Sequence, residues 1–350
     1  MHVAVVFDTP YPKYTVEDHL ARMEEELNPE REEEAETEYQ VAGALRDKGH
    51  EISLVGVHDD PAYALEALRE KKVDMVFNAS EGFRQRDGLD YLIPALLEAE
   101  GHPYTGSSPV GLMLTRNKGM SKKILAHHGV RVPEFRTYRI GEKVKRDAEL
   151  PFRMIVKPLS SDASVGISKS SIVRDMDALT ERVEYIHERF RDAAIAEQFI
   201  DGRELYVSVL GNGKRVELLP TVELVFDKEK TKPEERIATQ AAKWDDPYRE
   251  RNGIRSVFAR PLSKLAVERL EEACRTAYHA LWLRDYARLD VRLDDNDEVW
   301  VLEANANPFL AVGHEVANAA EKHGLAYADF IDKIVRAASA RYRNGKNGEG

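Results

Sequence analysis

The chain has 350 residues, of which 43% are hydrophobic and 32% are charged, and its formal net charge is −11. This composition is typical of a globular protein, and the length predicts two or three domains. The negative charge argues against a nucleic-acid partner, and no apolar run is long enough to cross a membrane. Because the N-terminus lacks a signal-peptide pattern, a cytoplasmic location is expected. The single cysteine, Cys274, excludes an intramolecular disulfide.

The first hundred residues alternate between short apolar runs and helical segments. Strands are predicted at residues 2–7, 51–57 and 73–77, and helices at residues 32–48 and 62–71. This order is typical of an open parallel sheet in an α/β fold. Ligands bind such sheets beyond the carboxyl ends of the strands, so the loop at residues 78–88 is a candidate site.

Two later segments carry groups suited to phosphate. A strand at residues 152–157 is followed by the small-residue loop 158–166, whose backbone N–H groups could contact phosphate oxygens. The loop lacks the Walker A pattern, and such a loop taken alone is more often an ordinary hairpin. Residues 227–255 form a long polar loop with four lysines, including Lys243, which predicts a lid. Between the N-terminal sheet and these segments, a basic helix is predicted at residues 110–128.

The sequence YARLDVRLDDNDEVWVLEANANPF, residues 286–309, predicts a β-hairpin. Apolar residues alternate on both sides of a turn that is rich in aspartate and asparagine. If Leu293 pairs with Glu298, then Arg288 lies opposite Glu303. Residues two apart in a strand share a face, so one face of this hairpin should be polar.

The polar face of the hairpin combines one guanidinium, two carboxylates and one amide oxygen. Its members are Arg288, Asp290, Glu303 and Asn305. Oxygen ligands of this kind suit Mg²⁺, and a guanidinium suits phosphate. The alternative is a solvated hairpin with cross-strand ion pairs. The neighbouring apolar runs, which are typical of buried strands, favour a site.

Six short motifs follow one another between residues 157 and 308. They are Lys157-Pro158, Ser164-Val165-Gly166, EQFIDGRE, AAKW, ARLD and LEANANP. Their order and spacing, together with an earlier PYTG segment and Lys118, resemble the D-alanine–D-alanine ligase branch of the ATP-grasp superfamily. The resemblance extends from about residue 73 to residue 334, most of the chain.

The resemblance implies an α/β fold of the ATP-grasp type, in which two domains clasp ATP. It divides the chain into an N-terminal open α/β domain (1–109), a central subdomain (110–195), a C-terminal subdomain with the metal site (196–338) and a disordered tail (339–350).

The resemblance also implies roles for individual residues. ATP would be bound by Lys118, Lys157, Glu197, Gln198, Phe199, Glu204 and Lys243. Mg²⁺ or Mn²⁺ would be bound by Asp290, Glu303 and Asn305. The catalytic residues would be Arg288, Ser164 and Lys243. The main chain of Gln198 and Phe199 would bind the adenine edge, and Glu204 would accept hydrogen bonds from the ribose. Taken singly, each lysine could be an ordinary surface residue.

The substrate-side motifs depart from the family pattern. Phe309 stands where the family has a glycine, and His314 stands where it has a serine that takes the second substrate's carboxylate. The lid tyrosine is Trp244, and the first serine of the phosphate loop is Ala163. The candidate substrate contacts are Tyr11, Glu81, Arg86 and His314. For each of these four, a purely structural hydrogen bond is the alternative.

These features predict an ATP-dependent carboxylate–amine ligase that works through an acylphosphate on substrates other than D-alanine. The alternatives are a genuine D-alanine–D-alanine ligase and an ATP-binding relative without catalysis. Amino acids or small peptides are the expected partners, and the resemblance also implies a homodimer.

Overall fold

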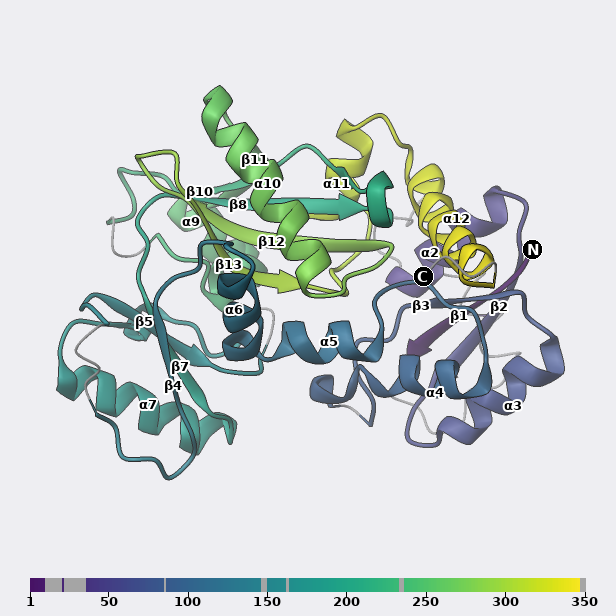
Figure 1. Cartoon of the computed structure of the whole chain (residues 1–350), viewed down its shortest axis with the longest axis horizontal. Helices are drawn as coiled ribbons and strands as arrows, with labels where there is room; N and C mark the ends of the chain where they lie inside the picture. Colours follow the sequence, from purple (N-terminus) through teal and green to yellow (C-terminus); the bar gives the residue numbers. More distant parts are fainter. Residues whose placement is uncertain are drawn as a thin grey trace.

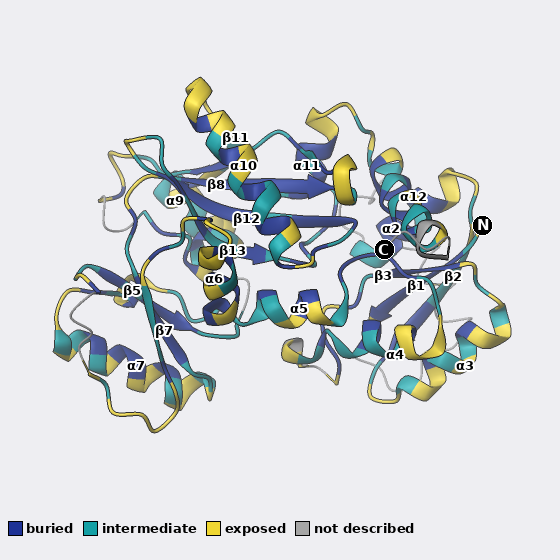
Figure 2. Ribbon diagram, viewed as in Figure 1, coloured by how far each residue is buried: buried dark blue, intermediate teal, exposed yellow. Residues whose placement is uncertain are grey.

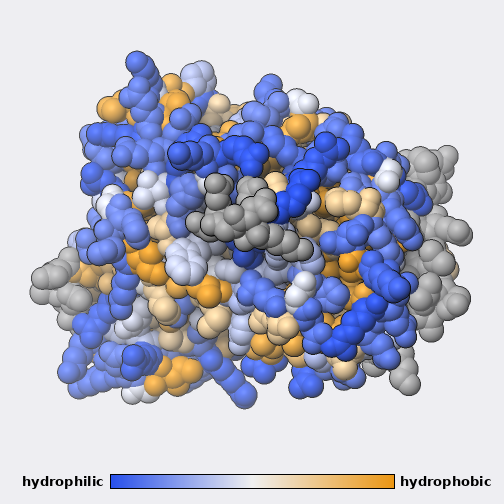
Figure 3. Space-filling model, turned by 45° about the vertical axis from the view of Figure 1, so that its right-hand side comes forward, coloured by the Kyte–Doolittle hydropathy of each residue, from blue (hydrophilic) through white to orange (hydrophobic). Residues whose placement is uncertain are grey.

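The computed structural model describes residues 1–9, 21, 36–84, 86–145, 150–161, 164–232 and 236–346. Three β-sheets, each accompanied by helices, form three lobes (Figure 1). The strands are largely buried, whereas the outer faces of the helices are exposed (Figure 2). On the face shown in Figure 3, most of the surface is hydrophilic and apolar residues lie in separate patches. No helix within the described ranges is long and apolar enough to cross a membrane.

The N-terminal lobe has a parallel sheet with the strand order β2-β1-β3, which confirms the predicted open α/β arrangement. Its elements are β1 (His2–Asp8), α2 (Thr37–Asp47), β2 (Glu51–Val57), α3 (Pro61–Lys71), β3 (Met75–Asn78) and α4 (Leu92–Glu100). Val3 and Val5 pack in one core and Ala4 and Val6 in another, because helices cover both faces of the sheet. The predicted first helix includes residues 32–35, which lie outside the described residues.

Two helices replace the single one predicted at residues 110–128. They are α5 (Pro109–Arg116) and α6 (Lys118–His127). Asn117 lies between them in an extended conformation, and its side chain accepts a hydrogen bond from the Met120 N–H at 3.0 Å. An asparagine N-cap of this kind begins a new helix. Lys118 is therefore the first residue of α6, at the edge of the central lobe.

The central lobe has an antiparallel sheet in the order β4-β7-β5-β6, covered by one helix. Its elements are β4 (Phe135–Tyr138), β5 (Met154–Pro158), β6 (Ile172–Val173), α7 (Met176–Phe190) and β7 (Ala194–Gln198). Short 3₁₀ turns in the chain are η1 (Asp87–Leu89), η2 (Lys169–Ser171) and η3 (Gly213–Arg215).

The largest sheet has the order β11-β10-β8-β12-β13, with β9 paired to β8, and α10 packs on it. Its elements are β8 (Arg203–Leu210), β9 (Glu217–Leu218), β10 (Val222–Val225), β11 (Arg255–Phe258), α10 (Lys264–Ala280), β12 (Tyr286–Leu293) and β13 (Val299–Asn305). The buried Cys274 of α10 belongs to this core and has no disulfide.

The predicted register of the β12–β13 hairpin is wrong. Leu293 pairs with Val299, and the register shifts by a bulge after Asp290. The turn is longer than expected because the Asp294 carboxylate accepts hydrogen bonds from the amides of Asn296 and Glu298 at 2.9 and 3.0 Å. As a result of the bulge, Asp290 lies opposite Glu303.

The segment predicted as a long lid loop at residues 227–255 contains two helices. They are α8 (Gln240–Trp244) and α9 (Asp246–Asn252), and β11 begins at its end. Each helix begins at a capping side chain, Thr239 for α8 and Asp245 for α9. The sequence did not predict these helices because the segment has few apolar residues. Both helices are short and depend on capping side chains rather than on a buried apolar face.

The prediction of a disordered tail at residues 339–350 is wrong for residues 339–346. After α11 (Glu315–Lys322), the last helix α12 (Tyr327–Lys346) continues through them. It lies beside α2 in the N-terminal lobe (Figure 1), where Phe330, Ile334 and Val335 join the core. Burial of this apolar face stabilises the helix. Residues 347–350 lie outside the described residues.

Candidate active site

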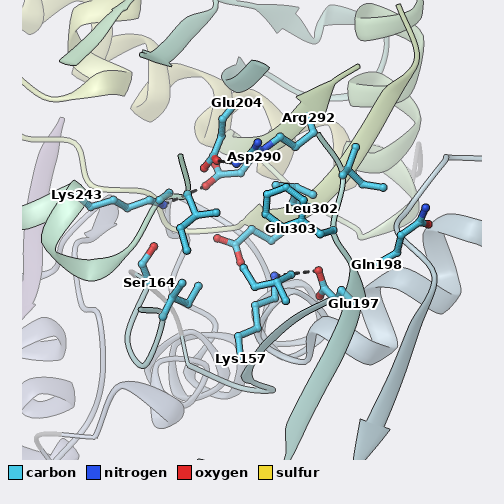
Figure 4. Close-up of a pocket in the computed structure, with 16 residues that line it drawn as sticks. Lys157, Ser164, Glu197, Gln198, Glu204, Lys243, Asp290, Arg292, Leu302 and Glu303 are labelled. Carbon is cyan, nitrogen blue, oxygen red and sulfur yellow. Dashed lines mark hydrogen bonds and ion pairs between the residues drawn. The ribbon is translucent and has the colours of Figure 1, made fainter. Parts of the chain in front are cut away.

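A cavity of about 70 Å³ lies between the central sheet and the largest sheet, and side chains from both point into it (Figure 4). We call it the inner cavity. The predicted site residues that line it are Lys157, Ser164, Glu197, Gln198, Phe199, Glu204, Lys243, Asp290 and Glu303. The apolar residues Ile155, Ile200, Ile237 and Leu302 line it as well, so it combines apolar and charged surface. Such a combination suits a nucleotide, which has a flat base and a charged phosphate chain.

A buried carboxylate, Glu197, lies between two buried lysines. Its oxygens lie 3.2 Å from Lys157 Nζ and 3.4 Å from Lys122 Nζ. Lys122 also donates to the Leu302 carbonyl at 2.6 Å. Burial lowers the pKa of Lys122 to about 8, although Glu197 acts in the opposite direction. Burial also acts to lower the pKa of Lys157, but the carboxylates of Glu197 and Glu303 outweigh it and raise that pKa.

Glu303 lies among four cations. Lys118 Nζ is 3.8 Å from Glu303 Oε2 and also donates to the Ser161 carbonyl. Burial acts to raise the pKa of Glu303, but Lys118, Lys157, Lys243 and Arg288 outweigh it and lower the pKa to about 2. Glu303 is therefore an ionised carboxylate at neutral pH.

Asp290 is bound by two cations, one from its own strand β12 and one from helix α8. Arg288 donates to it through Nε at 2.7 Å and Nη2 at 3.1 Å, and Lys243 Nζ lies 3.4 Å away. Burial acts to lower the pKa of Arg288, but Asp290 outweighs it and raises that pKa. Arg288 is therefore held in place and positively charged. A cation held in this way can stabilise negative charge that develops during a reaction.

The predicted metal ligands present only oxygen atoms. Asp290 and Glu303 face each other across β12 and β13, and the Asn305 side-chain oxygen, next on that face, accepts from the Asn307 N–H at 3.0 Å. This donor set fits Mg²⁺, which prefers a few carboxylate oxygens and keeps several waters. Within the described ranges no group of three or more His, Cys, Asp or Glu side chains is placed to hold a metal ion, so the third ligand would have to be the amide.

The segment after β7 narrows the predicted main-chain contact with adenine. The Gln198 N–H donates to the Glu134 carbonyl at 2.8 Å, and the Phe199 N–H donates to the Arg153 carbonyl at 3.0 Å. These two amides are therefore not available to adenine, and the two residues can offer it only carbonyl oxygens.

Glu204, the predicted ribose contact, has two protein partners. It accepts from Arg292 Nη2 at 2.6 Å and from the Tyr206 hydroxyl at 3.2 Å. Its remaining acceptor capacity faces the inner cavity, which it lines together with Arg292.

The loop that carries Ser164 is shaped by backbone geometry. Ser164 has a positive φ of 61° and lines the inner cavity. Gly166 has a φ of 74°, and a Cβ there would lie 2.8 Å from a Pro158 ring carbon, so glycine is required. The loop contacts the lid, because the Gln240 N–H donates to the Ile167 carbonyl at 3.4 Å. Ala163, also in this loop, lies outside the described residues.

A second hollow of about 430 Å³ adjoins the inner cavity and shares Lys243 and Glu303 with it. We call it the outer cavity. The predicted residues that line it are Glu81, Arg288, Asn305 and His314. Arg288 thus separates the negative charge of Asp290 from the space in which a second molecule would bind.

Three aromatic rings form part of the wall of the outer cavity. The Phe309 and His314 rings meet edge to face with centroids 4.5 Å apart, and the Trp244 ring lies 6.4 Å from each. Trp244 belongs to the lid helix α8, whereas Phe309 and His314 belong to the loop after β13. This cluster therefore joins α8 to the loop after β13 through three of the residues that depart from the family pattern.

Two of the predicted substrate contacts are not placed at the site. Arg86 is exposed and does not line either cavity; its backbone pairs with that of Phe83. Tyr11 lies outside the described residues. The structure therefore leaves Glu81 and His314 as the substrate candidates that line a cavity.

Several residues at the site were not predicted. They are Lys122, Arg292, Glu315 and the ion pair of Arg116 with Asp90 at 2.8 Å. Lys122 follows Lys118 by four residues and so lies on the same helix face, a spacing that could have indicated it. Burial acts to raise the pKa of Glu315, but Arg288 and Lys243 outweigh it and lower that pKa. Nothing in the sequence near Glu315 indicates this contact, which arises from folding.

The arrangement gathers lysines, an arginine and carboxylates around one cavity, and the single cysteine, Cys274, lies in a core, where burial raises its pKa. Phosphoryl transfer needs these groups, because it depends on positioning and on opposing negative charge.

Comparison with known proteins gives concordant results. A family model described as D-ala D-ala ligase C-terminus matches residues 124–336. The D-alanine–D-alanine ligase of Desulforudis audaxviator is 31% identical over 320 residues, which cover 90% of this chain and 96% of that one. An uncharacterised protein of Sinorhizobium fredii is 34% identical over 307 residues, covering 86% of this chain and 87% of the relative. The crystal structure of the Bacillus anthracis D-alanine–D-alanine ligase complexed with ATP has a TM-score of 0.73 at 22% identity, covering 99% of each chain.

The matched region contains both sheets that enclose the inner cavity. The fold is the mixed α/β fold of the ATP-grasp enzymes, as the sequence predicted. The relatives carry the names of enzymes, which favours the predicted ligase over a relative without catalysis. The chain belongs to the D-alanine–D-alanine ligase family and is an ATP-dependent ligase that forms C–N bonds.

Proposed function

We propose that this ligase joins the carboxylate of an amino acid or small peptide to an amine, and that its substrates differ from D-alanine. The three-ring cluster of Trp244, Phe309 and His314 is the observation that carries this proposal. These rings fill part of the wall of the outer cavity next to Arg288. A bulky wall at the place where a substrate binds changes which molecules can enter.

The proposed reaction has two steps. A substrate carboxylate oxygen attacks the γ-phosphorus of ATP, the bond to the bridging oxygen breaks, and ADP leaves with an acylphosphate formed. The amine nitrogen then attacks the acyl carbon, phosphate leaves, and the proton of the ammonium goes to solvent.

The described residues supply binding and charge for both steps. We propose that Lys118, Lys157 and Lys243 bind the phosphate chain and that Asp290, Glu303 and Asn305 hold Mg²⁺, which would neutralise charge on the transferred group. Arg288 would oppose the charge on the acylphosphate and on the oxyanion of the second step. The Ser164 loop and the lid with Lys243 would exclude water, which hydrolyses acylphosphates.

A genuine D-alanine–D-alanine ligase is the second candidate. Relatives that carry that name cover most of this chain at 30–32% identity. The inner cavity supports both candidates equally, since they share the phosphoryl-transfer step. The two therefore differ only in what the outer cavity accepts.

The decisive experiment measures phosphate release from ATP and Mg²⁺ over a panel of amino acids and short peptides, with products identified by mass spectrometry. Release with substrates other than D-alanine supports the proposal. Release with D-alanine alone would establish the second candidate, and no release with any mixture would contradict ligase activity.

Two further features remain proposals that rest on the resemblance. We propose the division into domains at residues 1–109, 110–195 and 196–338, which the three separate sheets support. The return of α12 to α2 adds the C-terminal helix to the N-terminal lobe. We also propose a homodimer, which sedimentation analysis would test directly.

A further inference from the structure

A third hollow of about 870 Å³ shares Lys243, His314 and Glu315 with the outer cavity. It lies between the lid helix α9, strand β11 and helix α11. We call it the acceptor groove; it is also lined by Arg249, Ser256, Phe258, Glu321 and Lys322. It extends an outer cavity whose own volume lies within the roughly 300–1,000 Å³ usual for a small-molecule site.

Glu315 stands where the outer cavity meets the groove. Its carboxylate interacts with Arg288, and the Ser256 hydroxyl donates to it at 3.4 Å. Because Arg288 and Lys243 lower its pKa, Glu315 is a carboxylate at neutral pH. It therefore attracts the ammonium of an amine substrate and repels a free carboxylate.

This charge discriminates between a single amino acid and a peptide. In a single amino acid the ammonium and the carboxylate are attached to one carbon, so an ammonium beside Glu315 brings its own carboxylate close to Glu315. In a peptide, each further residue moves the carboxylate away by up to about 3.3–3.6 Å. The same amine can then bind without that repulsion.

The groove has the chemistry to receive the rest of a peptide. Arg249 and Lys322 are cations that line it and could pair with a C-terminal carboxylate. The Phe258 ring, 41% exposed, lies 5.4 Å from Lys322 Nζ and offers apolar surface. A mixed polar and apolar lining of this kind suits a peptide chain.

We propose that the amine substrate is a peptide, whose N-terminal amine reacts beside Arg288 and whose remaining residues lie in the acceptor groove. This inference rests on the proposed function and names the class of one of its two substrates. The carboxylate substrate would remain in the part of the outer cavity next to the inner cavity, near Lys243 and Glu303.

The test uses acceptors that differ only in length. L-alanine, L-Ala-Gly and L-Ala-Gly-Gly, and the same series beginning with D-alanine, are each incubated with ATP, Mg²⁺ and a pool of amino acids as carboxylate donors. Phosphate release gives the rate, and mass spectrometry identifies the ligated product. We expect KM for the acceptor to fall by about tenfold from the single amino acid to the tripeptide.

A blocking variant locates the effect in the groove. Glu321→Trp places a bulky ring at an exposed position of α11 that lines the groove. It should raise KM for the tripeptide by about tenfold and leave KM for the single amino acid unchanged. Glu271→Trp, at an exposed position of α10 that does not line the groove, is the matched control and should change neither value.

The outcomes separate the inference from the proposed function. If several single amino acids are accepted as well as their tripeptides, and Glu321→Trp changes neither KM, the peptide acceptor is wrong. The proposal of substrates other than D-alanine would still hold. Turnover with D-alanine alone would overturn both. A peptide preference that Glu321→Trp abolishes, with Glu271→Trp unaltered, establishes the groove as the acceptor site.

Discussion

Arg341 of the last helix forms an ion pair with Asp285, at 2.8 Å, in the loop before β12. Asp285 is fully buried and also accepts from the Gly106 N–H and the Asn212 side chain at 2.9 and 2.6 Å. The pair thus joins the C-terminal helix, the end of the N-terminal lobe and the largest sheet. A segment that the sequence presented as a tail is part of the structural core.

Replacement of Arg341 should destabilise the whole chain. Arg341→Ala leaves the buried carboxylate of Asp285 without its cation, which should cost about 2–4 kcal/mol of unfolding free energy. Urea denaturation measures this loss. Arg343→Ala, at an exposed position of the same helix, is the control and should change stability by less than about 0.5 kcal/mol. Equal stability of the two variants would contradict a structural role for α12.

Glu303→Gln should lower kcat by at least about a hundredfold, because a neutral amide holds Mg²⁺ poorly at a phosphoryl-transfer site. The far-UV circular dichroism spectrum should not change. Asp295→Asn, in the exposed turn of the same hairpin, removes a carboxylate away from the site and should keep full activity. Unaltered turnover in Glu303→Gln would refute the assignment of the metal site to this hairpin.

Lys122→Met should raise KM for ATP by about tenfold. Lys122 bonds both Glu197 and the Leu302 carbonyl, so its loss frees the strand next to Glu303 and changes the position of Lys157. Initial-rate kinetics with varied ATP measure the effect. The neighbouring Lys123 is exposed, and Lys123→Met should leave KM unchanged. A change in kcat alone would argue against a positioning role.

Glu223 should contribute to stability only above acidic pH. Burial acts to raise the pKa of its carboxyl, but hydrogen bonds from Arg203 and Arg260 outweigh burial and lower the pKa to about 2. Its folded pKa lies below the unfolded value of 4.5, so its stabilisation is present above pH 4.5 and is lost as pH falls toward 2.

The comparison of wild type with Glu223→Gln isolates this contribution. The stability difference between the two proteins should be constant above pH 5 or so and should shrink as pH falls further. Glu272→Gln, an exposed carboxylate on α10, should show no such change. If the stability difference between wild type and Glu223→Gln stays constant until the protein unfolds in acid, Arg203 and Arg260 do not lower the pKa of Glu223.

The double variant Phe309→Gly, His314→Ser should raise kcat/KM for D-alanine by about tenfold over wild type. It removes two of the three rings from the wall of the outer cavity and restores the small residues that the family has there. Coupled phosphate release measures the rate. A fall in kcat/KM for D-alanine would indicate that these rings contribute to D-alanine binding instead of excluding it.

The sequence by itself determined the chemistry of the inner cavity. Lys157, Lys243, Asp290 and Glu303 lie there because local signals specify them: a strand before a small-residue loop, a polar lid and an alternating hairpin. Alternation of apolar and polar residues has a period of two in a strand, so it shows which side chains share a face. The parallel N-terminal sheet followed from the same kind of local pattern.

Only the tertiary structure decided the pairing and the neighbours of these residues. The bulge after Asp290 brings it opposite Glu303, and no local pattern reveals a bulge. Glu197 with Lys122, and Asp285 with Arg341, are contacts between elements far apart in the chain. Side chains that are distant in sequence meet only when burial of the apolar faces brings their elements together.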